Sequence, residues 1–124
     1  MGNMKRIAVI EKDDMLRIML ERLLGCLGYE AVGYDSPVSF PCTKDCCTLG
    51  RRCFDALIIN YRNNTDLDGV DFVIHQENKN CKISKMAVMS GSWDNEGLQK
   101  SRALKCKLLT KPFSIEELKD WLES

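Results

Sequence analysis

The chain has 124 residues, which is enough for one domain with a single hydrophobic core and too few for two such domains. Its 18 lysines and arginines balance its 18 aspartates and glutamates, so no net charge favours binding to nucleic acid or to an anionic membrane. The sequence contains no apolar run long enough to cross a bilayer, and residues 1–6 lead into a predicted strand rather than a signal peptide. We therefore expect a cytoplasmic protein whose partners are other proteins.

The N-terminal third predicts a strand, a helix and a second strand. Residues 5–10 form a compact apolar run that ends abruptly in a charged segment. Leucines then recur at helical spacing, with Asp13 or Asp14 as the cap and Gly28 at the end of the pattern. The leucines of this pattern are Leu16, Leu20, Leu23, Leu24 and Leu27. Residues 30–34 predict a short second strand before a turn that contains proline.

The middle of the chain contains the strand around which the fold is organised. Residues 55–60 hold four consecutive apolar side chains, which is typical of a strand buried on both faces. The preceding segment, 38–53, is poor in long aliphatic residues and contains Pro41, so we expect only a short or irregular helix there. This segment also contains four cysteines, Cys42, Cys46, Cys47 and Cys53.

The C-terminal half continues the alternation of strands and helices. After a polar loop, a modest helix begins near Gly69. Residues 83–89 and 107–110 predict a fourth and a fifth strand, separated by a weak helix over 94–104. Ser114 begins a Ser-Ile-Glu-Glu capping box, which predicts the start of the last helix. Short strands that alternate with helices indicate an α/β fold, in which a parallel sheet has helices on both faces.

Polar and charged residues follow the predicted strands, at the edge where the carboxyl ends of a parallel sheet gather. They are Glu11, Lys12 and Asp13 after the first strand, Asn60 after the third, Ser90 after the fourth and Lys111 after the fifth. We expect these side chains to form one functional pocket.

Four motifs, in this order and spacing, resemble the receiver domain of two-component response regulators over essentially the whole chain. They are Ile-Ala-Val-Ile-Glu-Lys-Asp-Asp (7–14), Asp-Ala-Leu-Ile-Ile-Asn (55–60) with Asp68-Gly69, Ala-Val-Met-Ser-Gly (87–91) and Leu-Thr-Lys-Pro-Phe (109–113). The resemblance implies a CheY-like, flavodoxin-like fold, in which a doubly wound sheet has five parallel strands in the order 2-1-3-4-5. It also implies a single receiver domain over residues 1–124, which acts as a stand-alone module of phosphorelay signalling and not as an enzyme with its own substrate.

In receivers, two acids after the first strand hold magnesium and an aspartate after the third strand accepts the phosphoryl group. A serine or threonine after the fourth strand and a lysine after the fifth contact that group. Ser90 and Lys111 match this pattern, but Asn60 replaces the acceptor and Lys12 replaces the second acid beside Glu11. An amide cannot form an acyl phosphate, and an ammonium repels a dication. We therefore predict a degenerate receiver that is not phosphorylated, has lost its Mg²⁺ site and needs no cofactor.

Lys12 has a more specific predicted role in this pocket. We expect it to replace the charge of the missing metal by bonding Glu11 or the side-chain oxygen of Asn60, which holds the receiver in one state. The alternative is that Lys12 projects into solvent and Asn60 caps its loop. An introduced Asp-to-Asn change would explain Asn60 but not Lys12. Leu108 is a further departure, because receivers commonly carry an aromatic switch residue at this position.

The expected partner is a sensor kinase or another regulator, bound through the face between the fourth and fifth helices of the receiver pattern. A homodimer is also compatible with the sequence. A conventional receiver with Asp66 or Asp68 as an unusual acceptor is disfavoured, because the acceptor needs a fixed position relative to the lysine.

A competing class is a metal-binding or redox-sensing module on a receiver scaffold. Its thiols would be Cys42, Cys46, Cys47 and Cys53, and its metal would be zinc or an iron–sulfur centre. Their spacing matches no known zinc finger, and a reducing compartment keeps cysteines unpaired. We therefore favour the interpretation that these cysteines are small buried residues and surface thiols.

Overall fold

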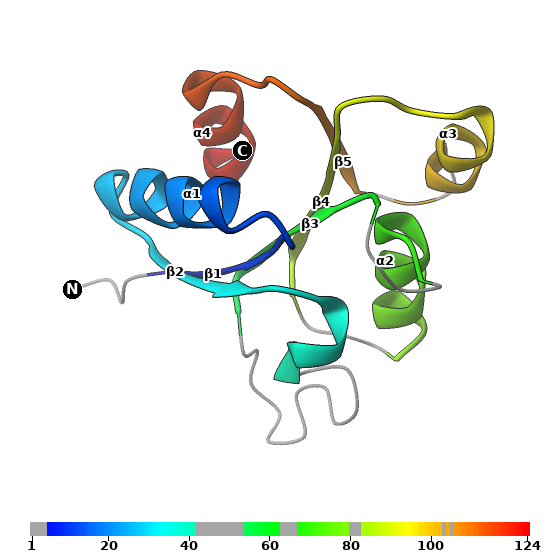
Figure 1. The fold of residues 1–124 in the computed structure, drawn as a ribbon, viewed down its shortest axis with the longest axis horizontal. Helices are drawn as coiled ribbons and strands as arrows, with labels where there is room; N and C mark the ends of the chain where they lie inside the picture. The colour runs from blue at the N-terminus through cyan, green and yellow to red at the C-terminus, as the bar shows by residue number, and fades with distance from the viewer. Residues whose placement is uncertain (1–4, 42–53, 63–66, 80–82, 103, 105) are drawn as a thin grey trace.

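The computed structural model describes residues 5–41, 54–62, 67–79, 83–102, 104 and 106–124. Strands and helices alternate within these ranges, and none of the helices found there is long and apolar enough to cross a membrane (Figure 1). The strands are β1 (Arg6–Ile10), β2 (Glu30–Tyr34), β3 (Ala56–Asn60), β4 (Lys85–Ser90) and β5 (Lys107–Thr110). The helices are α1 (Asp14–Cys26), the 3-10 helix η1 (Pro37–Ser39), α2 (Gly69–Asn78), α3 (Asn95–Arg102) and α4 (Ile115–Glu123).

The strands form one parallel sheet in the order β2-β1-β3-β4-β5, which confirms the predicted topology. The central strand β3 pairs with β1 through Leu57 opposite Ala8, and with β4 through Ile58 opposite Ala87. Every residue of β3 is buried. A strand in this position must direct apolar side chains to both faces of the sheet, which explains its unbroken apolar run.

Helices cover both faces of the sheet, with α1 and α4 on one side and α2 and α3 on the other (Figure 1). The core is divided accordingly, because successive side chains of a strand point to opposite faces. Ile58 belongs to the cluster that includes Leu20 of α1 and Leu118 of α4, whereas its neighbour Leu57 belongs to the cluster that includes Phe72 of α2. The sheet edge between these two layers is where the strand-end residues meet.

The helix termini follow the capping residues expected from the sequence. Asp13, and not Asp14, caps α1 by accepting two backbone N–H groups of its first turn. Ser114 caps α4, because its hydroxyl accepts the N–H of Glu117 at 3.0 Å. Gly28 has a φ of +95°, a left-handed conformation that glycine adopts readily, so the chain turns away from α1 at this point.

The described part of the segment after β2 contains the short η1 and then Phe40. Residues 42–53 lie outside the described residues, so the prediction of a short or irregular helix over 38–53 is tested only at its start. Phe40 packs against Phe54, with ring centroids 5.6 Å apart, and edge-on against Tyr34 at 5.5 Å. These aromatic contacts bury the apolar surface at the β2 end of the sheet.

Candidate functional site

The carboxyl ends of β1, β3 and β5 bring Glu11, Asn60 and Lys111 together. The Lys111 ammonium donates to Glu11 Oε1 at 3.0 Å and to Asn60 Oδ1 at 2.8 Å. The two ends of this group are 100 residues apart in the chain, and the parallel sheet is what makes them neighbours. We refer to these three residues as the Lys111 cluster.

Glu11 is the only carboxylate of the Lys111 cluster, and it is shielded from water. Its side chain is 2% exposed, compared with 26% for Lys111. Its second oxygen, Oε2, accepts the backbone N–H of Asp13 at 3.2 Å. A buried carboxylate needs a compensating charge and hydrogen-bond donors, and Lys111 supplies the charge. Glu11 and Lys111 therefore form an internally neutral ion pair.

Asn60 is held at both ends of its amide group. Its Oδ1 accepts the hydrogen bond from Lys111, and its Nδ2 donates to the carbonyl oxygen of Arg62 at 2.7 Å. An ammonium can only donate and a carbonyl can only accept, so these two contacts fix the orientation of the amide. Asn60 thus links Lys111 to the loop after β3. Its hydrogen bond to Arg62 also caps that loop, which is the role given to Asn60 in the alternative interpretation of the sequence.

Lys12 and Asp13 lie between β1 and α1, and both are exposed. The carboxylate of Asp13 caps α1. The Lys111 ammonium contacts both Glu11 and Asn60 Oδ1, so it supplies a counter-charge to the buried carboxylate. The predicted bond of Lys12 to Glu11 or Asn60 stays a prediction, as does the alternative that Lys12 projects into solvent.

Ser90 ends β4 beside the cluster, but its hydroxyl is engaged with its own loop. Ser90 Oγ donates to the carbonyl oxygen of Ser92 at 2.6 Å and accepts the N–H of Ser92 at 3.2 Å. The backbone N–H of Lys111 donates to the Ser90 carbonyl oxygen at 2.8 Å, which holds the two strand ends side by side. The structure therefore brings Ser90 next to Lys111 through the backbone.

Tyr61, Asp94 and Gly97 form a hydrogen-bonded group next to the Lys111 cluster, and this group was not predicted from the sequence. Tyr61 Oη donates to Asp94 Oδ1 at 2.9 Å, and the N–H of Gly97 donates to the same oxygen at 2.7 Å. The Trp93 ring packs on Tyr61, with centroids 5.2 Å apart. Burial, followed by the hydrogen bond to Asp94, raises the pKa of Tyr61 to about 12. The Gly97 N–H and then the Tyr61 hydroxyl lower the pKa of Asp94. The one available signal was Asp94 three residues before Gly97, which is the spacing of a helix cap.

Lys100 of α3 forms a second ion-pair group, which was also missed. Its ammonium lies 2.7 Å from Asp68 Oδ2 and 3.0 Å from Asp71 Oδ1. Burial acts to lower the pKa of Lys100, but the hydrogen bonds to the two carboxylates outweigh it and the net shift is upward. Asp68 also caps α2 through the N–H of Asp71. It therefore ties α2 to α3.

Solved receiver structures share this arrangement of elements. A response regulator receiver protein from Pseudomonas putida superimposes with a TM-score of 0.81, at 18% identity over 99% of this chain and 98% of that one. The chemotaxis protein CheY4 of Vibrio cholerae gives 0.75 at 20% identity over 98% of both chains. The signal receiver domain of a modulated diguanylate cyclase from Desulfovibrio desulfuricans G20 gives 0.78 at 20% identity, over 98% of this chain and 92% of that one. The chain has the receiver fold.

Sequence comparison adds no closer relationship. No protein-family model matches the sequence, and none of the curated proteins matches it either. Identities of this size show the receiver fold alone, so the chemistry of the site must be argued from its own residues. At the switch position of the receiver fold, Leu108 is half-buried and packs against the core cluster on the α2 side of the sheet.

The cysteines give a mixed result. The predicted cluster of Cys42, Cys46, Cys47 and Cys53 lies outside the described residues, so its metal or redox role stays a prediction. Among the residues that the structure does describe, no group of three His, Cys, Asp or Glu side chains could hold a metal ion. Two further cysteines, Cys26 and Cys106, are predicted from their places in the sequence to be packing positions. Cys106 is half-buried, and burial raises the pKa of its thiol. For Cys26 the prediction is wrong, because this residue is exposed at the end of α1.

Proposed function

We propose that this chain is a receiver module of two-component signalling that acts by binding another protein and does not take up a phosphoryl group. The receiver fold supports the signalling class. The observation that carries the silent state is the Lys111 cluster, in which Lys111 donates to both Glu11 and Asn60. Lys111 thus already has, within the protein itself, the oxygen partners that a bound phosphoryl group would otherwise provide.

The charge of the cluster supports the absence of a resident Mg²⁺. In the pattern that the resemblance implies, three carboxylates and one lysine leave two negative charges, which a dication neutralises. In this chain the charges of Glu11 and Lys111 cancel, Asn60 is neutral and Lys12 adds a positive charge, so the same four positions leave one positive charge. A dication would have to compete with the Lys111 ammonium for a single buried carboxylate, although Mg²⁺ sites rely on several oxygen ligands. Glu11 is therefore expected to pair with the Lys111 ammonium rather than with a metal ion.

The chemistry of Asn60 supports the absence of phosphoryl transfer. The acceptor in such a reaction is an anionic oxygen in line with the leaving group, and catalysis comes from positioning and charge. The amide of Asn60 has no anionic oxygen, and its Oδ1 already accepts a hydrogen bond from Lys111. The Ser90 hydroxyl, which would contact a phosphoryl oxygen, is engaged with Ser92. Asn60, Ser90 and Lys111 are therefore each hydrogen-bonded to other groups of the protein.

The proposed partner is a sensor kinase or another regulator that recognises the receiver surface and not a phosphate. The β5 edge of the sheet lies between α3 on one side and α4 on the other (Figure 1), and there α4 offers the partner an apolar side chain, Ile115, which is 43% exposed. The exposed Arg102 of α3 and Glu116 of α4 carry charges of opposite sign on the two helices. We expect binding of the partner to be the same with and without acetyl phosphate and Mg²⁺.

Intact-protein mass spectrometry after incubation with acetyl phosphate and Mg²⁺ tests the proposal. The expected result is no added phosphoryl group, and no heat of binding when beryllofluoride is titrated into the protein with Mg²⁺. A matched comparison is the double variant Lys12→Asp/Asn60→Asp, which restores the carboxylates of the receiver pattern. A Mg²⁺-dependent phosphoryl adduct on the unchanged protein contradicts the silent state, and fragment masses would then identify Asp66, Asp68 or another acceptor.

A further inference from the structure

Helix α1 has two apolar faces, although only one of them packs on the sheet. Leu20 and Leu24 are buried in the core cluster shared with α4. On the outward side, Met15, Ile18 and Met19 are 82%, 44% and 56% exposed. A helix at the surface of a globular protein normally presents polar side chains to water, so a second apolar face indicates a surface that another molecule covers.

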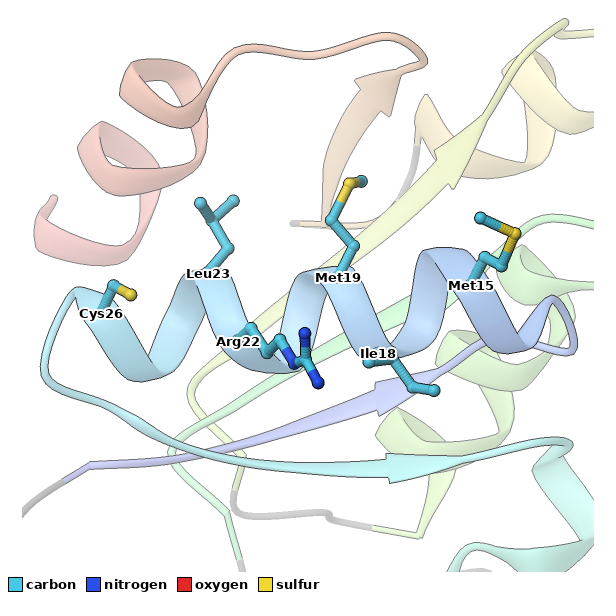
Figure 2. Close-up of a pocket in the computed structure, with 6 residues that line it drawn as sticks. All are labelled: Met15, Ile18, Met19, Arg22, Leu23 and Cys26. Atoms are coloured by element: carbon cyan, nitrogen blue, oxygen red, sulfur yellow. The ribbon is translucent and has the colours of Figure 1, made fainter.

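This outward face is a continuous open groove along the helix. It is lined by Met15, Ile18, Met19, Arg22, Leu23 and Cys26. Figure 2 shows these side chains following one another along α1 from one end to the other. A neighbouring groove shares Met19 and Leu23 with it and extends the apolar surface to Pro112 and Phe113. Methionine side chains adapt their shape to a partner, which suits this face to packing against another helix.

The charges on α1 are self-complementary. Asp14 lies in the first turn, Arg22 lies eight residues later, and Ile18 is midway between them. If two copies of α1 pair antiparallel with Ile18 on the two-fold axis, Asp14 of each copy lies opposite Arg22 of the other. A parallel pair would instead place like charges together. The antiparallel arrangement also opposes the two helix dipoles favourably.

The two charged side chains, Asp14 and Arg22, are available for these contacts. The Asp14 side chain is 77% exposed and bonds Arg17 through Oδ1 at 2.5 Å, and a carboxylate has acceptor positions on both oxygens. Arg22 is exposed. Each end of the antiparallel pair can therefore close with an ion pair around an apolar centre of Met15, Ile18 and Met19.

We propose that this protein forms a two-fold symmetric homodimer through antiparallel pairing of α1 with α1 of a second copy, centred on Ile18. The pairing involves neither Asn60 nor Glu11, so it does not depend on the proposed silence of the pocket. One helix from each copy forms a small interface, and small interfaces belong to weak or transient complexes. Association is therefore expected at micromolar concentrations and above.

Sedimentation equilibrium of the full chain, with a reducing agent present because Cys26 is exposed, measures this association. Over a range from about 1 μM to about 1 mM, the apparent mass should rise from that of one chain to that of two. Ile18→Asp places a charge from each copy at the centre of the pair and should weaken association at least about tenfold. Val38→Asp is the matched control, because Val38 is 78% exposed on η1 and lies outside the groove. Circular dichroism confirms that both variants fold.

A charge exchange tests the antiparallel register. Asp14→Arg and Arg22→Asp should each weaken the dimer, and the double variant Asp14→Arg/Arg22→Asp should restore it. A protein that stays monomeric over the whole range overturns the proposal, as does a dimer that Ile18→Asp leaves unchanged. A double variant as weak as the single ones overturns the antiparallel register, since that register requires the two positions to face each other.

Discussion

The ammonium of Lys111 and the amide oxygen of Asn60 lie 2.8 Å apart, at the ends of β5 and β3. With Glu11 at 3.0 Å, they place one positive charge between an anion and a neutral acceptor. This cation belongs to the protein itself. The pocket is therefore stabilised by an ion pair between two of its own side chains.

Removal of this cation should destabilise the protein. Lys111→Met leaves the buried carboxylate of Glu11 without its counter-charge and should cost about 2–3 kcal/mol of unfolding free energy at pH 7. This value lies below that of a fully buried pair, because the Lys111 side chain is 26% exposed. Urea unfolding followed by circular dichroism measures the change.

Two further variants show whether the cost comes from the unpaired charge. Glu11→Gln in the Lys111→Met background removes that charge and should recover part of the lost stability. Lys119→Met is the matched control, because Lys119 is an exposed lysine of α4 that is not part of the cluster, and its loss should change stability by no more than about 0.5 kcal/mol. Equal effects of Lys119→Met and Lys111→Met would contradict the assignment of a counter-charge to Lys111.

Restoring the carboxylates should create a magnesium site. Lys12→Asp/Asn60→Asp changes the pocket from one carboxylate and two ammoniums to three carboxylates and one ammonium. The two added anions attract a dication and provide oxygen ligands, so Mg²⁺ affinity should rise at least about tenfold. Isothermal titration calorimetry measures it, and each single variant should lie between the two extremes. No gain in the double variant would show that the receiver fold of this chain does not position these side chains for a metal.

The sheet could be predicted from the sequence because each strand carries its own local signal. The unbroken apolar run before Asn60 and the caps at Asp13 and Ser114 depend on residues close to one another in the chain. The segment 38–53 carries no such signal, and its described part contains only the short η1. The structure also shows the exposed methionines of α1, where the leucine pattern gave only the buried face.

The members of the pocket could be predicted, but not their contacts. Glu11, Asn60 and Lys111 were identified because strand ends meet at one edge of a parallel sheet. The contact of Lys111 with the Glu11 carboxylate depends on side-chain direction and burial, and these are set by packing from several elements. The hydrogen bond from Tyr61 to Asp94 joins positions 33 residues apart and has no sequence pattern. Long-range polar contacts of this kind appear only once the fold is known.

Gly69 is required by the close approach of α2 to the end of β3. A Cβ at this position would lie 2.8 Å from the backbone oxygen of Asn60 and 3.0 Å from Tyr61 Cα. Gly69→Ala should therefore destabilise the protein by about 1–3 kcal/mol, because backbone cannot move aside as a flexible side chain can. Gly25→Ala is the control, since a Cβ at this exposed helical position meets nothing within 4 Å and should stabilise by about 0.5–1 kcal/mol. Urea unfolding separates the two, and a stabilising Gly69→Ala would contradict the close packing.

Tyr61 should make stability fall at high pH. Burial and the hydrogen bond to Asp94 raise the pKa of its phenol to about 12, compared with 10.0 for an ordinary tyrosine. Between these values the unfolded chain has released the phenol proton while the folded chain retains it, so unfolding releases a proton and stability falls as pH rises. The contribution is complete below pH 10 and is lost as pH rises through about 12.

The variant Tyr61→Phe isolates this contribution from the titration of lysines in the same range. It should lose about 1 kcal/mol at pH 7, because Asp94 keeps the Gly97 N–H but loses the phenol donor. Its stability should then fall less steeply than that of the unchanged protein between pH 10 and pH 12. Urea unfolding at several pH values gives the two slopes, and absorbance at the tyrosinate band should show one fewer late-titrating phenol in the variant. If stability fell equally steeply with pH in both proteins, folding would not raise the pKa of Tyr61. The hydrogen bond to Asp94 would then not stabilise the protonated phenol.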